Sequence, residues 1–239
     1  MKLTNFRINN NLKINYFVDK NVFNPTMTSK IIINSLIKQK KIISKYKKIL
    51  DLGCGSGIIA LSIKKIFKNC EIYLSDSSYK AVKLSIKNLK YNKIKNYKIK
   101  QSDLLNSWSK EKFDIIINDV SAISSFFKEK KFWYNKFIPC DSGLSGNKNT
   151  LKILDTAPEY CKIMIMPLIS LSNIEEIKIF LKKKKYQFKV LSRENWPLPD
   201  NLIKKHKRKL LQLKNKKIID FKEQFGMCIA YTEVIQINL

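Results

Sequence analysis

The chain has few of the residue types on which many functional sites depend. Its single histidine, His206, lies in a lysine-rich run, so a catalytic triad or metal centre built on histidine is not expected, and we place this residue on the solvated surface. The five cysteines show no Cys-x-x-Cys pair, which argues against a disulfide framework or a zinc site and favours buried free thiols in a reducing cytosol. No apolar run approaches the roughly 20 residues of a membrane span, and no signal-peptide core is present. We therefore expect a soluble, cytoplasmic protein that binds no metal and no membrane.

Arginine is also scarce, which bears on the strong positive charge. The formal net charge of +28 suggests a nucleic-acid partner. Only three of the 47 basic residues are arginine, although guanidinium is the better group for bidentate contacts to phosphates. Abundant Lys, Ile and Asn are what A/T-rich codons supply. Nucleic-acid binding therefore stays open, and the basic segment 201–217, expected to be helical, is either a solvated helix face or a clamp on nucleic acid.

Glycine is scarce too, but its distribution is uneven. Three of the six glycines, Gly53, Gly55 and Gly57, fall within the segment LDLGCGSG. Glycine costs about 1 kcal/mol relative to alanine in regular structure and is favoured where the backbone turns sharply or touches a ligand. The segment follows a strand pattern and opens a helical one, but its Gly-x-Gly-x-Gly spacing is not that of dinucleotide-binding loops. It predicts a loop whose backbone lies against a ligand.

The hydrophobic pattern from Lys48 onward alternates between strands and helices. Short apolar runs such as FDIIIND are typical of buried parallel strands. The alternation predicts an α/β fold with a Rossmann-like, doubly wound, mostly parallel sheet of seven strands. We expect residues 1–45 to form a lead-in hairpin and helix, and residues 46–239 to form a single domain. Ser172 and Glu175 have the spacing of a capping box at the start of a late helix.

Acidic residues end three successive predicted strands. Asp51 closes the first strand, Asp76 the second and Asp103 the third. Ligands of such sheets bind at the carboxyl ends of the strands, so these side chains are expected at one site. A carboxylate at Asp76 can accept hydrogen bonds from two ribose hydroxyls. Asp76 and Asp103 could each instead cap the helix that follows.

Together these motifs resemble the class I S-adenosylmethionine-dependent methyltransferases. The segments ILDLGCGSG, QSDLL and FDIIIND carry the resemblance, and VFNPTMTSKII is similar to the small-methyltransferase branch, which includes release-factor glutamine and ribosomal-protein methyltransferases. The resemblance implies S-adenosylmethionine as cofactor, with its methionine end over the glycine loop, its ribose at Asp76 and its adenine at Asp103. The cofactor-binding residues that it implies are Asp51, Gly53, Cys54, Gly55, Gly57, Asp76, Ser77, Asp103, Leu104 and Asn118.

The segment after the fourth predicted strand carries the candidate catalytic residues. It reads Asn118-Asp119-Val120-Ser121, where many members of the branch have Asn-Pro-Pro-Tyr, so only the asparagine matches. We expect Asn118 to orient the acceptor and Asp119 to act as a general base. The alternatives are a turn formed by Asn118 and a helix cap formed by Asp119.

Two further segments are candidates for the acceptor pocket. The irregular segment 133–146 contains Trp133 and Tyr134, and long loops over a strand-end site are usually functional or disordered. Residues 194–200 are expected to pack beside it. Pro25, Thr26 and Thr28 either line the same pocket or simply begin a helix.

The acceptor is not readable from the sequence. The expected function is methyl transfer from S-adenosylmethionine to a macromolecule, either a protein side chain or RNA. A small-molecule methyltransferase, an aminopropyl transferase and a non-catalytic module that binds RNA or a partner remain alternatives. The oligomeric state is not indicated.

Overall fold

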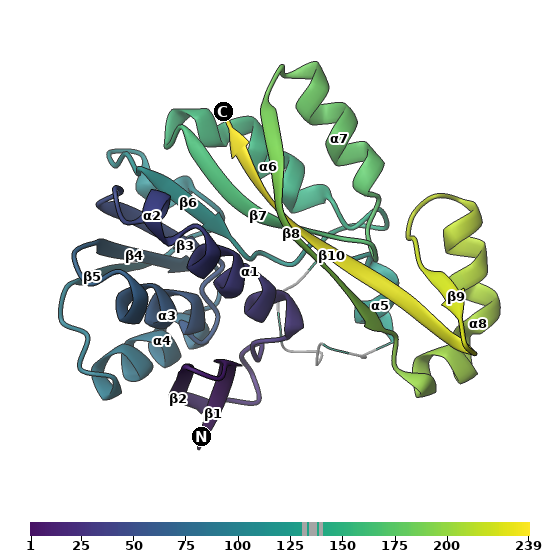
Figure 1. Ribbon diagram of the computed structural model, residues 1–239, viewed down its shortest axis with the longest axis horizontal. Coiled ribbons are helices and arrows are strands. Elements are labelled where there is room, and N and C mark those ends of the chain that lie inside the picture. The colour runs from purple at the N-terminus through teal and green to yellow at the C-terminus, as the bar shows by residue number, and fades with distance from the viewer. Residues whose placement is uncertain (131–132, 134–137, 139–140) are drawn as a thin grey trace.

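A large β-sheet with helices on both of its faces organises the protein (Figure 1). The computed structural model describes residues 1–130, 133, 138 and 141–239. In chain order the elements are β1 (Lys2–Asn9), β2 (Leu12–Val18), α1 (Met27–Lys38), α2 (Lys40–Ile43), β3 (Lys48–Leu52), α3 (Ile58–Ile66), β4 (Glu71–Asp76), α4 (Tyr79–Tyr91), β5 (Tyr97–Gln101), η1 (Asn106–Trp108), β6 (Ile115–Asn118), α5 (Ser125–Glu129), α6 (Lys148–Thr156), η2 (Ala157–Glu159), β7 (Ile163–Ile169), α7 (Ile174–Lys183), β8 (Gln187–Pro197), α8 (Asp200–Asn215), β9 (Lys222–Gln224) and β10 (Met227–Asn238).

The sheet has the order β5-β4-β3-β6-β7-β10-β8, and β9 pairs with β10 outside this path. β3 to β7 pair in parallel, and β10 runs antiparallel to both of its neighbours. Leu52 at the end of β3 is level with Ser75 in β4 and with Asn118 in β6. The segments that follow these strands therefore meet at one edge. The predicted doubly wound, mostly parallel sheet is confirmed, with β9 as an unexpected addition.

Successive residues of the central strands enter different hydrophobic cores. Ile49 of β3 packs in the core beneath α1 and α3, whereas its neighbour Leu50 packs in the core beneath α6 and α7. Ile115 and Ile116 of β6 divide in the same way. Because side chains alternate across a strand, a strand covered on both faces is apolar throughout, which explains the uninterrupted isoleucines of β6.

The N-terminal lead-in is an antiparallel hairpin of β1 and β2, followed by α1. The Asn88 side chain of α4 joins this hairpin to the glycine loop. Its Oδ1 accepts a hydrogen bond from the Phe17 backbone N–H at 2.6 Å, and its Nδ2 donates to the Ser56 carbonyl at 2.8 Å. The hairpin is thereby tied to the segment that follows β3. The division of the chain after residue 45 stays a prediction.

Two expectations from the sequence are wrong in detail. Asn173, not Ser172, caps α7, because its Oδ1 accepts from the Glu176 backbone N–H at 3.1 Å. His206 is half-buried instead of solvated: it lies at a kink in α8, with its ring edge-on to Phe126 and the ring centroids 5.8 Å apart. The reason is that the apolar face of α8 packs on α5, and His206 lies at the border of that contact.

The described cysteines, Cys54, Cys70, Cys161 and Cys228, are all buried and free, as expected of structural thiols; Cys140 lies outside the described residues. Within the described part of the chain, no group of His, Cys, Asp and Glu could hold a metal ion. Among the helices described, none is long and apolar enough to cross a membrane.

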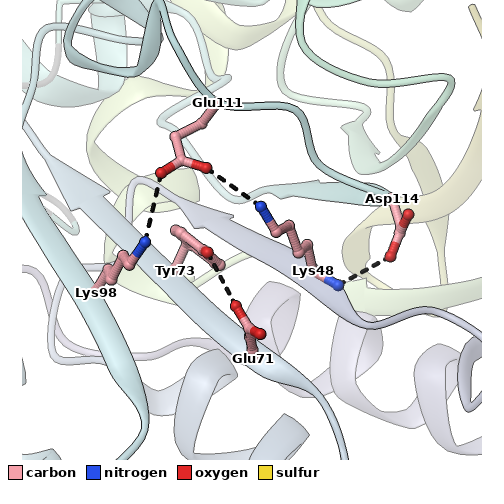
Figure 2. A network of polar contacts seen from close by, with 6 residues as sticks. All are labelled: Lys48, Glu71, Tyr73, Lys98, Glu111 and Asp114. Carbon is pink, nitrogen blue, oxygen red and sulfur yellow. Dashed lines mark hydrogen bonds and ion pairs between the residues drawn. The ribbon is translucent and has the colours of Figure 1, made fainter.

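The amino ends of the parallel strands carry a network of paired charges (Figure 2). Glu111 forms ion pairs with Lys48 at 3.5 Å and with Lys98 at 3.6 Å. Asp114 accepts hydrogen bonds from two backbone N–H groups at the start of β3, at 2.7 and 2.9 Å. Glu111 and Asp114 are thus both bound to neighbouring groups, so we interpret this end of the sheet as structural.

Candidate functional site

The glycine loop between β3 and α3 has a left-handed backbone at each glycine. Gly53 has φ of 78°, and a Cβ there would lie 2.8 Å from Cγ2 of Val120 in the segment after β6. At Gly57, with φ of 80°, a Cβ would lie 3.1 Å from the Ser85 hydroxyl. The chain itself therefore requires glycine at these two positions. Gly55 also has positive φ, but the nearest atom to its Cβ would be 3.6 Å away, which is an ordinary contact.

A cavity of about 280 Å³ lies along the carboxyl edge of the sheet, from the end of β5 to the end of β8. Its volume is close to that of small-molecule sites. Three carboxylates, from Asp76, Asp103 and Asp119, contribute to its lining, and no lysine or arginine does among the described residues. In a chain with a net charge of +28, this is the most unusual feature of the site.

Asp76, at the end of β4, is held by backbone amides. Its Oδ2 accepts from the Gly55 N–H at 2.9 Å and its Oδ1 from the Ser78 N–H at 2.8 Å. Burial raises the pKa of the Asp76 carboxyl above its usual value, and these hydrogen bonds act in the opposite direction. Each oxygen keeps a second lone pair, so the carboxylate is fixed in place with acceptor capacity left. Asp103, at the end of β5, also lines the cavity and is exposed.

Asp119 follows β6 and lines the middle of the cavity wall. Its Oδ2 accepts a hydrogen bond from the Ser29 hydroxyl of α1 at 2.8 Å. Burial raises the pKa of Asp119 to about 7, although the Ser29 hydrogen bond favours the charged form. Such a carboxyl can take up or release a proton near neutral pH, which is what a general base requires.

Asp51 lies beneath the glycine loop and is fully buried. Its Oδ2 accepts from the Ala60 N–H at 3.1 Å, whereas its Oδ1 has no hydrogen-bond partner among the described residues. Burial, followed by repulsion from Asp119, raises the pKa of Asp51 to about 8. Buried polar atoms in proteins are usually paired, so this orphaned oxygen is an anomaly of the kind that functional sites retain.

Asn118 occupies a different place from Asp119. Its side chain is buried, and its Oδ1 accepts from the Val120 N–H at 3.0 Å, which closes the turn after β6. It does not line the cavity.

The predicted cofactor residues therefore divide into two groups. The cavity is lined by Gly53, Cys54, Gly55, Asp76, Ser77, Asp103 and Leu104. Three others, Asp51, Gly57 and Asn118, lie behind this lining.

The opposite end of the cavity is apolar and aromatic. Trp133 and Trp196 both line it, with ring centroids 6.2 Å apart and ring planes at 87°. Trp196 comes from β8, which extends into residues 194–200, the segment expected to pack beside the irregular one. Its indole N–H donates to the Thr232 hydroxyl at 3.0 Å. Tyr134 lies outside the described residues. The expected pocket residues Pro25, Thr26 and Thr28 also line the cavity.

Sequence reasoning missed some lining residues. Ile169 ends β7 and Leu171 follows that strand, and the strand-end rule applied to the fifth parallel strand would have found them. Ser29 was missed because a serine at the start of a helix resembles a simple turn residue. Its contact to Asp119 joins residues 90 positions apart in the chain, which no local pattern reveals.

One family model and several curated relatives are similar to part of the chain. Residues 17–119 match the model of the methyltransferase small domain. A release factor glutamine methyltransferase of Thermodesulfovibrio yellowstonii is 31% identical over 156 residues, which cover 63% of this chain and 55% of that protein. The chain thus spans about half the length of this curated relative. The resemblance to the small-domain branch of the methyltransferases that the sequence predicted is found over residues 17–119.

Solved structures agree at the level of the fold. The Mtq2–Trm112 complex of E. cuniculi, described as methylating the termination factor eRF1, matches with a TM-score of 0.57 and 14% identity, over 91% of this chain and 98% of that one. The T. thermophilus 16S rRNA N2 G1207 methyltransferase, with AdoMet and guanosine, matches with a TM-score of 0.55 and 13% identity, over 97% of this chain and 50% of that one.

Proposed function

We propose that this chain, whose residues 17–119 match the methyltransferase small domain, is an S-adenosylmethionine-dependent methyltransferase that acts on a macromolecule. The observation that carries the proposal is the acidic cavity described above. Three carboxylates line it and a fourth, Asp51, lies beneath it, yet no basic side chain faces it among the described residues.

This arrangement favours a cationic ligand. Lysine is abundant, and acidic groups elsewhere, such as Glu111 and Asp155, have lysine partners. Buried carboxylates without a cation are destabilising, so a group that neutralises them is expected in the functional state. S-adenosylmethionine carries a sulfonium and an ammonium. A dinucleotide, by contrast, would bring a pyrophosphate toward unpaired carboxylates.

The residues present fit the parts of this cofactor. Asp76 is preorganised by two backbone amides and is suited to accept hydrogen bonds from ribose hydroxyls. Ser102, Asp103 and Leu104 would lie beside the adenine, and the Gly53–Gly55 backbone beside the methionine part. The unpaired Oδ1 of Asp51 lies beneath the loop, and a cation bound above it would favour the charged form of this carboxyl.

Asp119 is suited to accept a proton from the acceptor. When bound, the cofactor supplies a methyl group whose bond to sulfur breaks, leaving the electron pair on a neutral thioether. The acceptor atom gives its lone pair to the methyl carbon, and its proton passes to the Asp119 carboxylate. The Ser29 hydroxyl holds that carboxylate in place. Positioning donor and acceptor is itself worth up to roughly 7–11 kcal/mol.

A macromolecular acceptor is supported by the relatives. The T. yellowstonii relative is named for action on a release factor, and the T. thermophilus structure is of an enzyme of ribosomal RNA. Trp133, Trp196 and Asp119 line the same cavity, so a planar acceptor group held by the two rings would share that cavity with the carboxylate.

Transfer of tritiated methyl groups tests the proposal. The purified chain is incubated with labelled S-adenosylmethionine and lysate of a strain that lacks it, and the lysate is then fractionated into protein, RNA and small molecules. We expect label in protein or RNA that is absent when Asp119→Asn replaces the unmodified chain. Label in small molecules alone would refute a macromolecular acceptor, and no transfer to any fraction would refute the activity.

A further inference from the structure

A basic helical lobe adjoins the aromatic end of the cavity. This α8 lobe, residues 200–226, is inserted between β8 and β10 and consists of α8, β9 and the turn to β10 (Figure 1). Leu202 and Leu210 on its inner face pack in the same hydrophobic cluster that Trp133 and Trp196 contact. The lobe is therefore joined directly to the wall of the cavity at its acceptor end.

The outer face of α8 carries an uncompensated positive charge. Lys204, Lys205, Arg208 and Lys209 are all exposed, and none forms an ion pair with a described residue. Lys207 is different, because it pairs with Glu223 at 3.0 Å and so ties α8 to β9. A charged helix face is common in proteins and does not by itself indicate a binding partner. A second, independent feature of the lobe distinguishes a binding surface from a solvated face.

That feature is Phe225, at the tip of the turn between β9 and β10. Gln224 pairs with Met227, so Phe225 and Gly226 form a two-residue hairpin loop, and both have positive φ, at 50° and 73°. Asn, Asp and Gly are strongly preferred where both loop residues have positive φ. A bulky residue in this conformation is an outlier. Packing of the Phe225 ring does not offset this strain, because the residue is 87% exposed.

A strained turn that exposes an aromatic ring, on the same lobe as a row of cations, has the chemistry of a single-stranded RNA surface. Unpaired bases stack on such rings, and neighbouring basic side chains follow the phosphates. Backbone strain of this kind persists where function requires it. The sheet register places Trp196 opposite Ala230, five residues from Phe225, which is roughly 17 Å along the strand.

We propose that the methyl acceptor is RNA. A single-stranded segment or loop binds the α8 lobe through its phosphates, stacks one base on Phe225, and presents another to the two tryptophans of the cavity that Asp119 also lines. This inference rests on the proposed function for the identity of the reaction. The RNA surface itself is testable without any methyl transfer.

The test compares two charge-reversed forms of the full chain by fluorescence anisotropy with a labelled, mixed-sequence, single-stranded RNA. One form carries Lys204→Glu, Lys205→Glu and Lys209→Glu on α8. The matched control carries Lys182→Glu, Lys183→Glu and Lys185→Glu, equally exposed residues at the end of α7. The charge change is identical. We expect at least tenfold weaker binding in the α8 form alone, with a salt dependence reduced by about 2 in logarithmic slope, at about 0.7 per phosphate contact.

Phe225→Asn separates function from structure. Asparagine suits the turn, so we expect a higher melting temperature together with roughly tenfold weaker RNA binding. Equal losses in the α8 and α7 forms would overturn the proposal, because only bulk charge would then matter. It would also be overturned if RNA binding were unchanged while transfer to a protein fraction fell, which would make the lobe a protein-docking surface. The affinity for S-adenosylmethionine is measured for each form. If the unmodified chain did not bind this cofactor, the proposed reaction would be refuted, whereas the comparison of RNA binding would remain valid.

Discussion

The acidic side chains at the two ends of the parallel sheet differ in burial and in cationic partners. At the amino ends, Glu111 has two lysine partners and Asp114 accepts two backbone N–H groups. At the carboxyl ends, Asp51, Asp76 and Asp119 have no cationic partner among the described residues, and burial raises the pKa of all three. Lysine is available throughout the chain, so the lack of cationic partners at the carboxyl ends is informative. We interpret the carboxyl ends of the strands as the site and the amino ends as scaffold.

The largest expected effect is on turnover. Asp119→Asn keeps the shape of the side chain and an oxygen for the Ser29 hydroxyl, but removes the base. We expect a fall in kcat of about 10² to 10⁴, with cofactor affinity changed less than threefold. Asp114→Asn, at the paired end, is the matched control and should leave kcat within twofold. If the two substitutions lowered kcat equally, the carboxyl ends of the strands would not differ from the amino ends in their role in catalysis.

Cofactor affinity should respond next. Asp76→Ala removes the carboxylate placed for the ribose, and the loss of a charged hydrogen bond should weaken binding by about 1–3 kcal/mol. Glu111→Ala removes a carboxylate that pairs with Lys48 at the opposite end of β3 and should leave affinity unchanged. Equilibrium dialysis with labelled S-adenosylmethionine measures both. Unaltered affinity in Asp76→Ala would refute the ribose assignment.

The stability of the cofactor-free protein should fall as pH rises. The folded-state pKa values of Asp51 and Asp119, about 8 and about 7, lie above those of the unfolded chain. The folded state therefore binds more protons between about pH 4 and pH 8, and the free energy of unfolding decreases across that window. Each group contributes at most about 1.4 kcal/mol per pH unit. Urea unfolding at several pH values should show a shallower decrease for Asp51→Asn; an unchanged slope would mean that Asp51 does not titrate there.

The smallest effect is expected at Asn118. Asn118→Ala removes the hydrogen bond to the Val120 N–H, which should lower the free energy of unfolding by about 1 kcal/mol. Turnover should fall modestly, because the same turn positions Asp119. Chemical denaturation and steady-state kinetics measure the two quantities. A large loss of kcat with unchanged stability would instead give Asn118 a direct role at the acceptor.

The sequence predicted the parts of the molecule that depend on local pattern. The Ile run of β6 and the strand that ends at Asp76 predicted the parallel sheet. The rule that ligands bind at strand ends correctly predicted that Asp76 and Asp103 lie at one cavity. It did not separate Asn118 from Asp119, because adjacent residues at a strand end point in different directions and composition does not say which one faces the ligand. The Ser29–Asp119 contact and the packing of His206 depend on how distant elements meet.

Calorimetric titration of the unmodified protein at neutral pH, with S-adenosylmethionine and in parallel with NAD⁺, shows which class of ligand the acidic cavity binds. We expect saturable binding of S-adenosylmethionine at a single site and no measurable binding of NAD⁺, because the cavity wall is acidic and has no described basic side chain for a pyrophosphate. Absence of S-adenosylmethionine binding, or binding of NAD⁺ with equal affinity, would refute S-adenosylmethionine as the cofactor.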